Sequence, residues 1–299
     1  MSHVDDTVPA QGMAGESSSA PSTAQADTPE SMYLELLMGC LTRSIFGEKY
    51  RPVTAPRGSL RWALYWPVRR LLGTARLEIV RRYDLDPGVR ASGHDWPVDA
   101  ETMVGLRRLE NLQSCITDVL NRQVPGDLIE TGVWRGGACI FMRAVLKVHG
   151  DTTRTVWAAD SFRGLPKPNV QANPVDAGDR LWSYQNLAVP VAEVRSNFAR
   201  YGLLDGQVRF LEGWFSETLR SAPIESLAVL RLDGDMYGST MDALTALYPK
   251  LSVGGYVIVD DYYAMPSCRQ AVSDYRSAHG ITDEIIDIDW TGVYWRRDG

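Results

Sequence analysis

The feature that most constrains the fold is a repeated alternation, from about residue 100 onward, of short apolar runs and stretches of helical spacing. The runs are continuously apolar, which is typical of strands buried on both faces of a parallel sheet. Crossover helices then cover both faces, so the sheet is doubly wound. The predicted strands are Leu128–Gly132, Thr155–Ala159, Val208–Gly213, Leu227–Leu232 and Gly254–Val259, and the predicted helices lie near 101–121, 136–148, 190–201, 239–249 and 267–278.

Two further strands are predicted at the C-terminus, Glu284–Ile288 and Gly292–Arg296. Only a few residues separate them, and so short a link requires an antiparallel hairpin. We therefore expect a Rossmann-like α/β fold, with a doubly wound, mostly parallel sheet of seven strands that ends in an antiparallel hairpin.

The first thirty residues differ in composition from the rest of the chain. They contain five acids, no Lys or Arg and no aromatic residue, and they account for most of the formal net charge of −6. Such a segment buries too little apolar surface to offset its ordering entropy, so we predict a disordered acidic tail over 1–30. It lacks the basic and apolar character of a signal or transit peptide. The remainder has no basic excess, which argues against nucleic acid as a partner.

Residues 31–100 are predicted to form a helical lid or oligomerisation region ahead of a catalytic domain at 101–299. Helical spacing predicts a helix over 31–46. The stretch 51–90 holds nine arginines against three acids, with the aromatic residues Trp62, Tyr65 and Trp66 among them. It could lie on a membrane surface, bind an anionic partner, cover a bulky substrate, or pack as ordinary helices whose arginines reach water. Pro67 and Gly73 are expected to interrupt any single long helix there.

The cysteines and histidines point to no metal site of their own. Four cysteines occur without a C-x-x-C pair, which favours reduced thiols and a cytoplasmic protein. His279 precedes Gly280, a pair typical of a helix C-terminus with a left-handed glycine. For His94 we expect a packed loop, with a place at the border of the site as the alternative.

Carboxylates follow two of the predicted strands. Asp233 and Asp235 come after Leu227–Leu232, and Asp260 and Asp261 come directly after Val259. Because ligands of an open parallel sheet bind beyond the carboxyl ends of its strands, these acids are expected to converge. Converging carboxylates repel one another unless a cation lies among them, and Mg²⁺ prefers oxygen ligands. Alternatively, the acids are ordinary strand-end, turn or helix-capping residues.

The first strand leads into a glycine turn of spacing G-x-x-x-G-G, formed by Gly132, Gly136 and Gly137. Such a turn lets the backbone approach a ligand at the helix N-terminus, and a purely structural turn is the alternative. The second strand ends at Asp160, which can accept hydrogen bonds from ribose hydroxyls. The third ends in Gly213-Trp214, a suitable wall for an adenine. Together these strand ends favour a nucleotide-type cofactor.

The chain resembles the macrocin O-methyltransferase family, whose members methylate sugars of macrolide and aminocoumarin natural products and use S-adenosylmethionine with magnesium. The likeness covers about residue 93 to the C-terminus. The motifs that carry it are Thr102-Met-Val-Gly-Leu-Arg-Arg-Leu, Leu128-Ile-Glu-Thr-Gly-Val-Trp-Arg-Gly-Gly, Ala159-Asp-Ser-Phe-Arg-Gly-Leu-Pro, Asn197-Phe-Ala-Arg-Tyr-Gly-Leu-Leu, Leu232-Asp-Gly-Asp-Met-Tyr-Gly-Ser-Thr, Val259-Asp-Asp-Tyr and Gly292-Val-Tyr-Trp-Arg-Arg.

The resemblance implies a glycosylated small-molecule acceptor, a homodimer or higher homo-oligomer, and no integral membrane segment. It implies magnesium ligation by Asp233, Asp260 and Asp261. Implied contacts to S-adenosylmethionine come from Thr102, Met103, Glu130, Thr131, Gly132, Trp134, Arg135, Gly136, Asp160, Ser161, Arg163, Gly213, Trp214 and Asp233.

A sugar hydroxyl is a poor nucleophile until it is deprotonated. Magnesium chelated by two neighbouring hydroxyls would lower the pKa of one of them, and a carboxylate would take its proton. Catechol methyltransferases place a lysine three residues after the first aspartate, and here that position is Met236. The base is therefore expected to be a carboxylate, with Asp233 the first choice and Asp235 the second.

Other classes of function stay open at this point. The chain could methylate a phenol or catechol, which the missing lysine disfavours, or it could be a non-catalytic cofactor-binding scaffold. An NAD-dependent dehydrogenase is a weaker alternative, because the glycine spacing differs from G-x-G-x-x-G.

Overall fold

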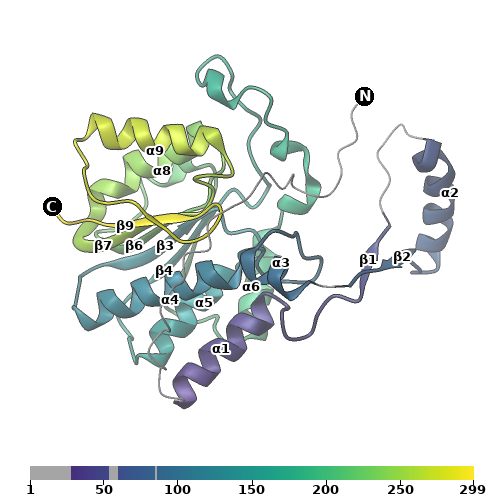
Figure 1. Ribbon diagram of the computed structural model, residues 1–299, viewed down its shortest axis with the longest axis horizontal. Coiled ribbons are helices and arrows are strands. Elements are labelled where there is room, and N and C mark those ends of the chain that lie inside the picture. The colour runs from purple at the N-terminus through teal and green to yellow at the C-terminus, as the bar shows by residue number, and fades with distance from the viewer. Residues whose placement is uncertain (1–27, 54–59, 85) are drawn as a thin grey trace.

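The computed structural model describes residues 28–53, 60–84 and 86–299. A central sheet of seven strands runs in the order β5-β4-β3-β6-β7-β9-β8 (Figure 1). Strands β3 to β7 pair in parallel, and β9 pairs antiparallel with both β7 and β8. The prediction of a mostly parallel sheet with an antiparallel C-terminal hairpin is confirmed. The strands are β3 (Asp127–Thr131), β4 (Val156–Asp160), β5 (Val208–Glu212), β6 (Leu227–Leu232), β7 (Leu251–Val259), β8 (Ile286–Asp287) and β9 (Val293–Arg296).

Helices cover both faces of the sheet (Figure 1). Neighbouring strand residues face opposite layers, so Leu128 of β3 belongs to one buried cluster and Ile129 to the other. This explains why the strand runs are continuously apolar. One face carries α4 (Leu106–Asn121), α5 (Gly137–Val148) and α6 (Val191–Arg200), and the other carries α7 (Phe215–Thr218), α8 (Tyr237–Leu247) and α9 (Pro266–Ala278).

Two loops that border the site differ from the predicted elements. The helix expected from residue 101 begins at Leu106, because Gly105 is its N-cap in an extended conformation. Residues 101–105 are therefore a loop, and Thr102 and Met103 lie in it. Between β4 and α6 the chain forms only short 3₁₀ turns at Pro174–Asp176, Leu181–Ser183 and Gln185–Leu187.

Helix α1 (Pro29–Leu41) packs on α5 and α4 and buries Leu34, Leu37 and Leu41. Thr28 caps it, since its side chain accepts a hydrogen bond from the Ser31 backbone N–H. The helix ends at Leu41, not at 46 as predicted, and Arg43 then takes the left-handed φ of 58°. Of the predicted tail, residues 1–27 lie outside the described residues, and Pro29 and Glu30 already belong to α1.

The arm comprises β1 (Tyr50–Pro52), α2 (Leu60–Thr74) and β2 (Val80–Arg82), with β1 and β2 paired antiparallel. In Figure 1 α2 stands away from the sheet and its covering helices, and none of its described residues is buried. The prediction that Pro67 interrupts a long helix is wrong, because Pro67 lies inside α2, whereas α2 does end at Thr74, one residue after Gly73. A proline removes one backbone N–H from the helical ladder, and the turns on either side of it still form. Helix α3 (Pro87–Ser92) follows the arm.

The cysteines are free thiols, as predicted. His279 ends α9, with its Nδ1 2.8 Å from the Tyr275 carbonyl oxygen, and Gly280 follows at φ 63°, so the capping prediction is confirmed. Among the described helices, none has the length and apolarity needed to cross a membrane.

Candidate active site

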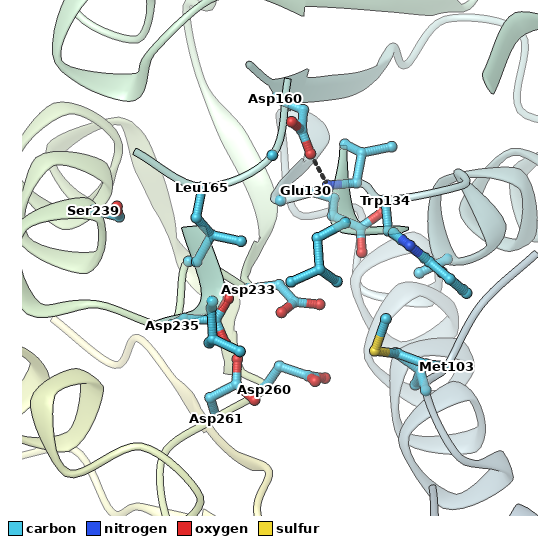
Figure 2. Close-up of a pocket in the computed structure, with 18 of the residues that line it drawn as sticks. Met103, Glu130, Trp134, Asp160, Leu165, Asp233, Asp235, Ser239, Asp260 and Asp261 are labelled. Atoms are coloured by element: carbon cyan, nitrogen blue, oxygen red, sulfur yellow. Dashed lines mark hydrogen bonds between the residues drawn. The ribbon is translucent and has the colours of Figure 1, made fainter. Parts of the chain in front are cut away.

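A cavity of about 430 Å³ lies beyond the carboxyl ends of the parallel strands, where the ligand crevice of an open α/β sheet is expected. Figure 2 shows acids from different strands around it, with Glu130 and Asp160 at one end and Asp233, Asp235, Asp260 and Asp261 together at the other. The sequence-predicted residues that line it are Thr102, Met103, Glu130, Gly132, Trp134, Asp160, Ser161, Gly213, Trp214, Asp233, Asp235, Asp260 and Asp261.

Other predicted cofactor residues do not line this cavity. Thr131 is fully buried, and Arg163 lies beside the lining residue Ser161. The guanidinium of Arg135 donates to the backbone carbonyls of Val98 at 2.6 Å and Ala100 at 2.9 Å. Arg135 thus ties the glycine turn to the segment before α4, and its contact with a cofactor stays a prediction, as do those of Thr131 and Arg163.

The glycines of the first turn serve two different purposes. Gly132 lines the cavity at φ 92°, and an added Cβ would overlap the carbonyl oxygen of Asp233. Its missing side chain therefore lets the ends of β3 and β6 approach each other closely. Gly136 has φ 91°, but an added Cβ there would meet Val194 Cγ1 of α6 at 2.8 Å. Gly136 is thus needed for packing against α6, and a direct contact with a cofactor stays a prediction.

Asp160 and Glu130 form one end of the cavity. Asp160 Oδ2 accepts from the Val133 backbone N–H at 2.7 Å, the dashed bond in Figure 2, and Oδ1 accepts from Phe162 N–H at 2.7 Å. Ser161 Oγ also donates to Oδ1, at 3.4 Å, and the carboxylate lines the cavity, where donors of a ligand can approach it. Glu130 lies deeper, where the Cys139 thiol donates to it at 2.9 Å and burial raises the pKa of its carboxyl to about 7.

Asp233, Asp235 and Asp261 each bring a carboxylate oxygen within 4.8 Å of the others. Burial, and next the charges of neighbouring carboxylates, raise the pKa of Asp233 to about 6 and that of Asp235 to about 8, and raise the pKa of Asp261 well above its usual value. Asp261 Oδ2 is buried and has no hydrogen-bond partner among the described residues. Crowded carboxylates with an unpartnered oxygen are a donor set that fits a hard divalent cation.

Asp260 lies in the same cavity, but its carboxylate is already paired. One oxygen accepts from Arg108 and the other from Arg231, and both guanidinium groups are buried. Of the metal residues predicted from sequence, the structure thus groups Asp233 and Asp261, and it brings Asp235 to them in place of Asp260.

Sequence reasoning missed these two buried arginines. Arg231 is 1% exposed and bonds Glu130, Asp260 and Asp233, the last at 2.9 Å. Arg108 bonds Asp260 and also Asp289, at 3.0 Å. The signal for Arg231 was present, because a charged residue inside an otherwise apolar buried strand needs a buried partner. No comparable signal marked Arg108.

The wall opposite the sheet is apolar and aromatic. The His94 ring stacks on the Trp290 ring at a centroid distance of 4.3 Å, and Trp96 meets Tyr184 edge-on at 5.7 Å. His94 therefore both packs in its loop and lines the cavity. No described residue of α2 lines it, so the predicted lid role of Trp62, Tyr65 and Trp66 stays a prediction. Leu165, Pro166, Leu181 and Leu187 complete this wall.

The strand order, the reversed C-terminal hairpin and the site at the carboxyl ends of the strands define a Rossmann-like class I methyltransferase fold. Within that class, the family model described as macrocin-O-methyltransferase (TylF) matches residues 30–297. The chain belongs to this family.

Individual relatives agree with this assignment. The chain is 60% identical over 215 residues to the 8-demethyl-8-(2,3-dimethoxy-alpha-L-rhamnosyl)-tetracenomycin-C 4'-O-methyltransferase of Streptomyces olivaceus, covering 72% of this chain and 81% of that protein. It is 57% identical over 211 residues to the mycinamicin III 3''-O-methyltransferase of Micromonospora griseorubida, covering 70% and 83%. The solved structure of the O-methyltransferase NovP superposes with a TM-score of 0.76 at 47% identity, over 90% of this chain and 100% of that one.

Proposed function

We propose that this protein transfers a methyl group from S-adenosylmethionine to a sugar hydroxyl of a glycosylated natural product, with Mg²⁺ as a cofactor. The observation that carries the proposal is the presence, in one cavity, of a nucleotide-type end at Asp160 and a cluster of three carboxylates. The sugar acceptor is inferred from the relatives, the first of which is named for a rhamnosyl tetracenomycin.

At the cofactor end, Asp160 would accept hydrogen bonds from the ribose hydroxyls, while the backbone N–H groups of Val133 and Phe162 keep its carboxylate in place. Trp134 and Trp214 line the cavity and would supply aromatic surface to the adenine. S-adenosylmethionine supplies an already activated methyl group, so no nucleophilic side chain is needed. The protein's task is to hold the hydroxyl and the methyl group in line.

At the other end, Asp233, Asp235 and Asp261 would hold the metal, and Asp260 could join them if its arginine pairs rearranged. A divalent cation supplies Lewis acidity, which makes a hydroxyl easier to deprotonate. Asp235 is favoured over Asp233 as the base, because Arg231 donates to Asp233 at 2.9 Å and stabilises its charged form.

The proposal is tested by following transfer of labelled methyl from S-adenosylmethionine to a panel of glycosylated macrolides, aminocoumarins and tetracenomycins. The matching aglycones and simple catechols serve as controls. Methylation of a glycoside but not of its aglycone would support a sugar hydroxyl. Turnover of catechols alone would show that the acceptor is a catechol and not a sugar. No turnover despite tight cofactor binding would favour a non-catalytic subunit.

We further propose a cytoplasmic homo-oligomer, with the arm in the contact between subunits. The support is the exposure of Leu60 (78%), Leu64 (69%) and Leu71 (71%) on α2, because contiguous exposed apolar surface marks an interaction site. Sedimentation velocity over a range of concentrations tests the assembly, and a monomer at every concentration would contradict it.

A further inference from the structure

A short series of charges, from the half-buried Arg51 to the buried Asp95 and Arg90, joins the arm to the wall of the cavity. Arg51 of β1 donates from Nη2 to Asp95 Oδ2 at 3.1 Å, and Arg90 of α3 places Nη1 3.0 Å from Asp95 Oδ1. The Asp95 side chain is only 6% exposed, and Asp95 lines the cavity. One carboxylate is therefore held by the arm on one side and by the body on the other.

Arg90 extends the series to a second part of the wall. Its side chain is 1% exposed, and Nη2 donates to the backbone carbonyls of Met103 at 2.6 Å and Val104 at 3.2 Å. Both of these residues line the cavity. A buried guanidinium is stable only when its charge is paired, so Arg90 depends on Asp95.

The position of the Arg51 side chain depends on its neighbours in and beside the arm. Its guanidinium carbon lies 3.5 Å from the centroid of the Tyr83 ring, and its Nε lies 3.4 Å from Glu48 Oε2. Its backbone pairs with Arg81 of β2. Arg51 thus reaches Asp95 only while β1 and β2 are paired next to Tyr83.

The loop that carries Asp95 borders the acceptor end of the cavity. His94 stacks on Trp290, which lies in the link between β8 and β9. In the sheet order, β9 follows β7 and lies at the opposite side from β4, which carries Asp160. Residues 93 and 94 therefore close the cavity beyond the carboxylate cluster, whereas Trp96 meets Tyr184 of the segment that follows β4.

We propose that Arg51, Asp95 and Arg90 form a positioning relay, through which the arm holds loop 93–96 in the shape that binds the acceptor. The name of the ligand rests on the proposed function, whereas the effect on the loop does not. Arg51 acts through Asp95 and is a positioning residue. When Arg51 is removed, Asp95 loses its contact with the arm, so the acceptor end loosens. Arg90 still donates to the Met103 carbonyl, so the cofactor end keeps its structure.

The first test uses Arg51→Gln in the full chain, with Arg81→Gln as the matched control, because Arg81 is its cross-strand neighbour and carries the same charge. Hydrogen–deuterium exchange is followed without any ligand. We expect Arg51→Gln to speed exchange of the backbone amides of residues 93–96, 98 and 99 about tenfold, as for a local opening released by loss of a partly buried ion pair. Arg81→Gln should leave these amides unchanged, and the amides of α5 should be unchanged in both variants.

The second test separates the two ends of the cavity. In Arg51→Gln we expect the acceptor KM to rise about fivefold with kcat within about twofold, the pattern of lost ground-state binding. The Kd of S-adenosylhomocysteine, measured by titration calorimetry, should stay within about twofold of wild type. Adding Asp95→Asn to Arg51→Gln should raise the acceptor KM by less than the product of the two single effects, because both residues act through one contact.

Unchanged exchange in loop 93–96 of Arg51→Gln would overturn the relay. Equal effects of Arg51→Gln and Arg81→Gln would also overturn it, because the effect would then come from the charge of the arm alone. If the wild-type protein methylates no glycoside, the proposed function fails, and the exchange experiment still decides the relay.

Discussion

In the body of the protein, the helices that flank the sheet bury their apolar faces, whereas the arm leaves its apolar side chains exposed. Leu109 and Leu112 of α4 are 0% exposed, while Leu64 and Leu71 of α2 are 69% and 71% exposed. The body thus obtains its stability from burial within one chain. The arm is instead connected to the body by charged groups, Arg51 above all, and its apolar surface is left exposed. The body therefore provides the stability of the fold, and the arm is the part whose position can adjust.

The largest effect is expected where the body is most closely packed. Gly132→Ala should destabilise the protein by more than about 4 kcal/mol, because the added Cβ overlaps Asp233 O and φ is 92°. Gly150→Ala is the matched control, with φ 68° and nothing within 4 Å of an added Cβ, and should cost about 1 kcal/mol. Urea unfolding measures both. Similar losses for the two variants would mean that the approach of β3 to β6 is not tight.

The next effect concerns the metal. Chelation with EDTA should abolish turnover and added Mg²⁺ should restore it, and Asp261→Asn should raise the Mg²⁺ concentration needed about tenfold or more, because an amide ligates more weakly than a carboxylate. Asp298→Asn, an exposed acid of the C-terminus, is the control. Chelation should also lower Tm, because Arg231 and Arg108 pair with Asp233 and Asp260, whereas Asp235 and Asp261 have no paired cation among the described residues. Full turnover after exhaustive chelation would rule out the metal.

A direct test of the comparison removes one leucine from each region. Leu112→Ala in α4 should lower the free energy of unfolding by about 2–5 kcal/mol, because it leaves a cavity in the core. Leu71→Ala in α2 should change it by less than about 0.5 kcal/mol in dilute protein. If Leu71→Ala proves as harmful as Leu112→Ala, then α2 is buried in the assembly even at low concentration.

The smallest effect is expected from the N-terminus. Deleting residues 1–27 should leave Tm and turnover nearly unchanged, because that composition offers no apolar face and because Thr28 still caps α1. Differential scanning calorimetry and a steady-state assay measure the two quantities. A clear fall in either would show that the segment contacts the body or a second subunit.

The sheet was predictable because its signal is local. Strand β6 has the predicted bounds, Leu227–Leu232, and β3 and β4 begin within one residue of their predictions. Burial on both faces leaves a continuous apolar run that needs no knowledge of partners. Residues 161–190 contain no such apolar run, and their 3₁₀ turns could not be predicted from the sequence. Helix α2 was misjudged because Pro67 was read as an interruption, whereas α2 forms through it.

The site was predictable in its chemistry but not in its pairing. The strand ends located Asp233, Asp235, Asp260 and Asp261 at one cavity, which follows from parallel topology alone. Which acid an arginine would engage depends on side-chain distances that sequence spacing does not encode. For that reason the pairing of Asp260 with Arg108 became visible only in three dimensions.

The guanidinium of Arg231 has a consequence for anyone who redesigns this enzyme. It bonds Glu130, Asp233 and Asp260 at once, so an acid of the proposed cofactor end and acids of the proposed metal end share one counter-charge. Substitutions that alter the preference for the methyl donor and substitutions that alter the preference for a metal are therefore expected to have non-additive free energies. A variant library for either property should randomise these three acids together with Arg231, because selecting them one at a time would discard combinations that work only jointly.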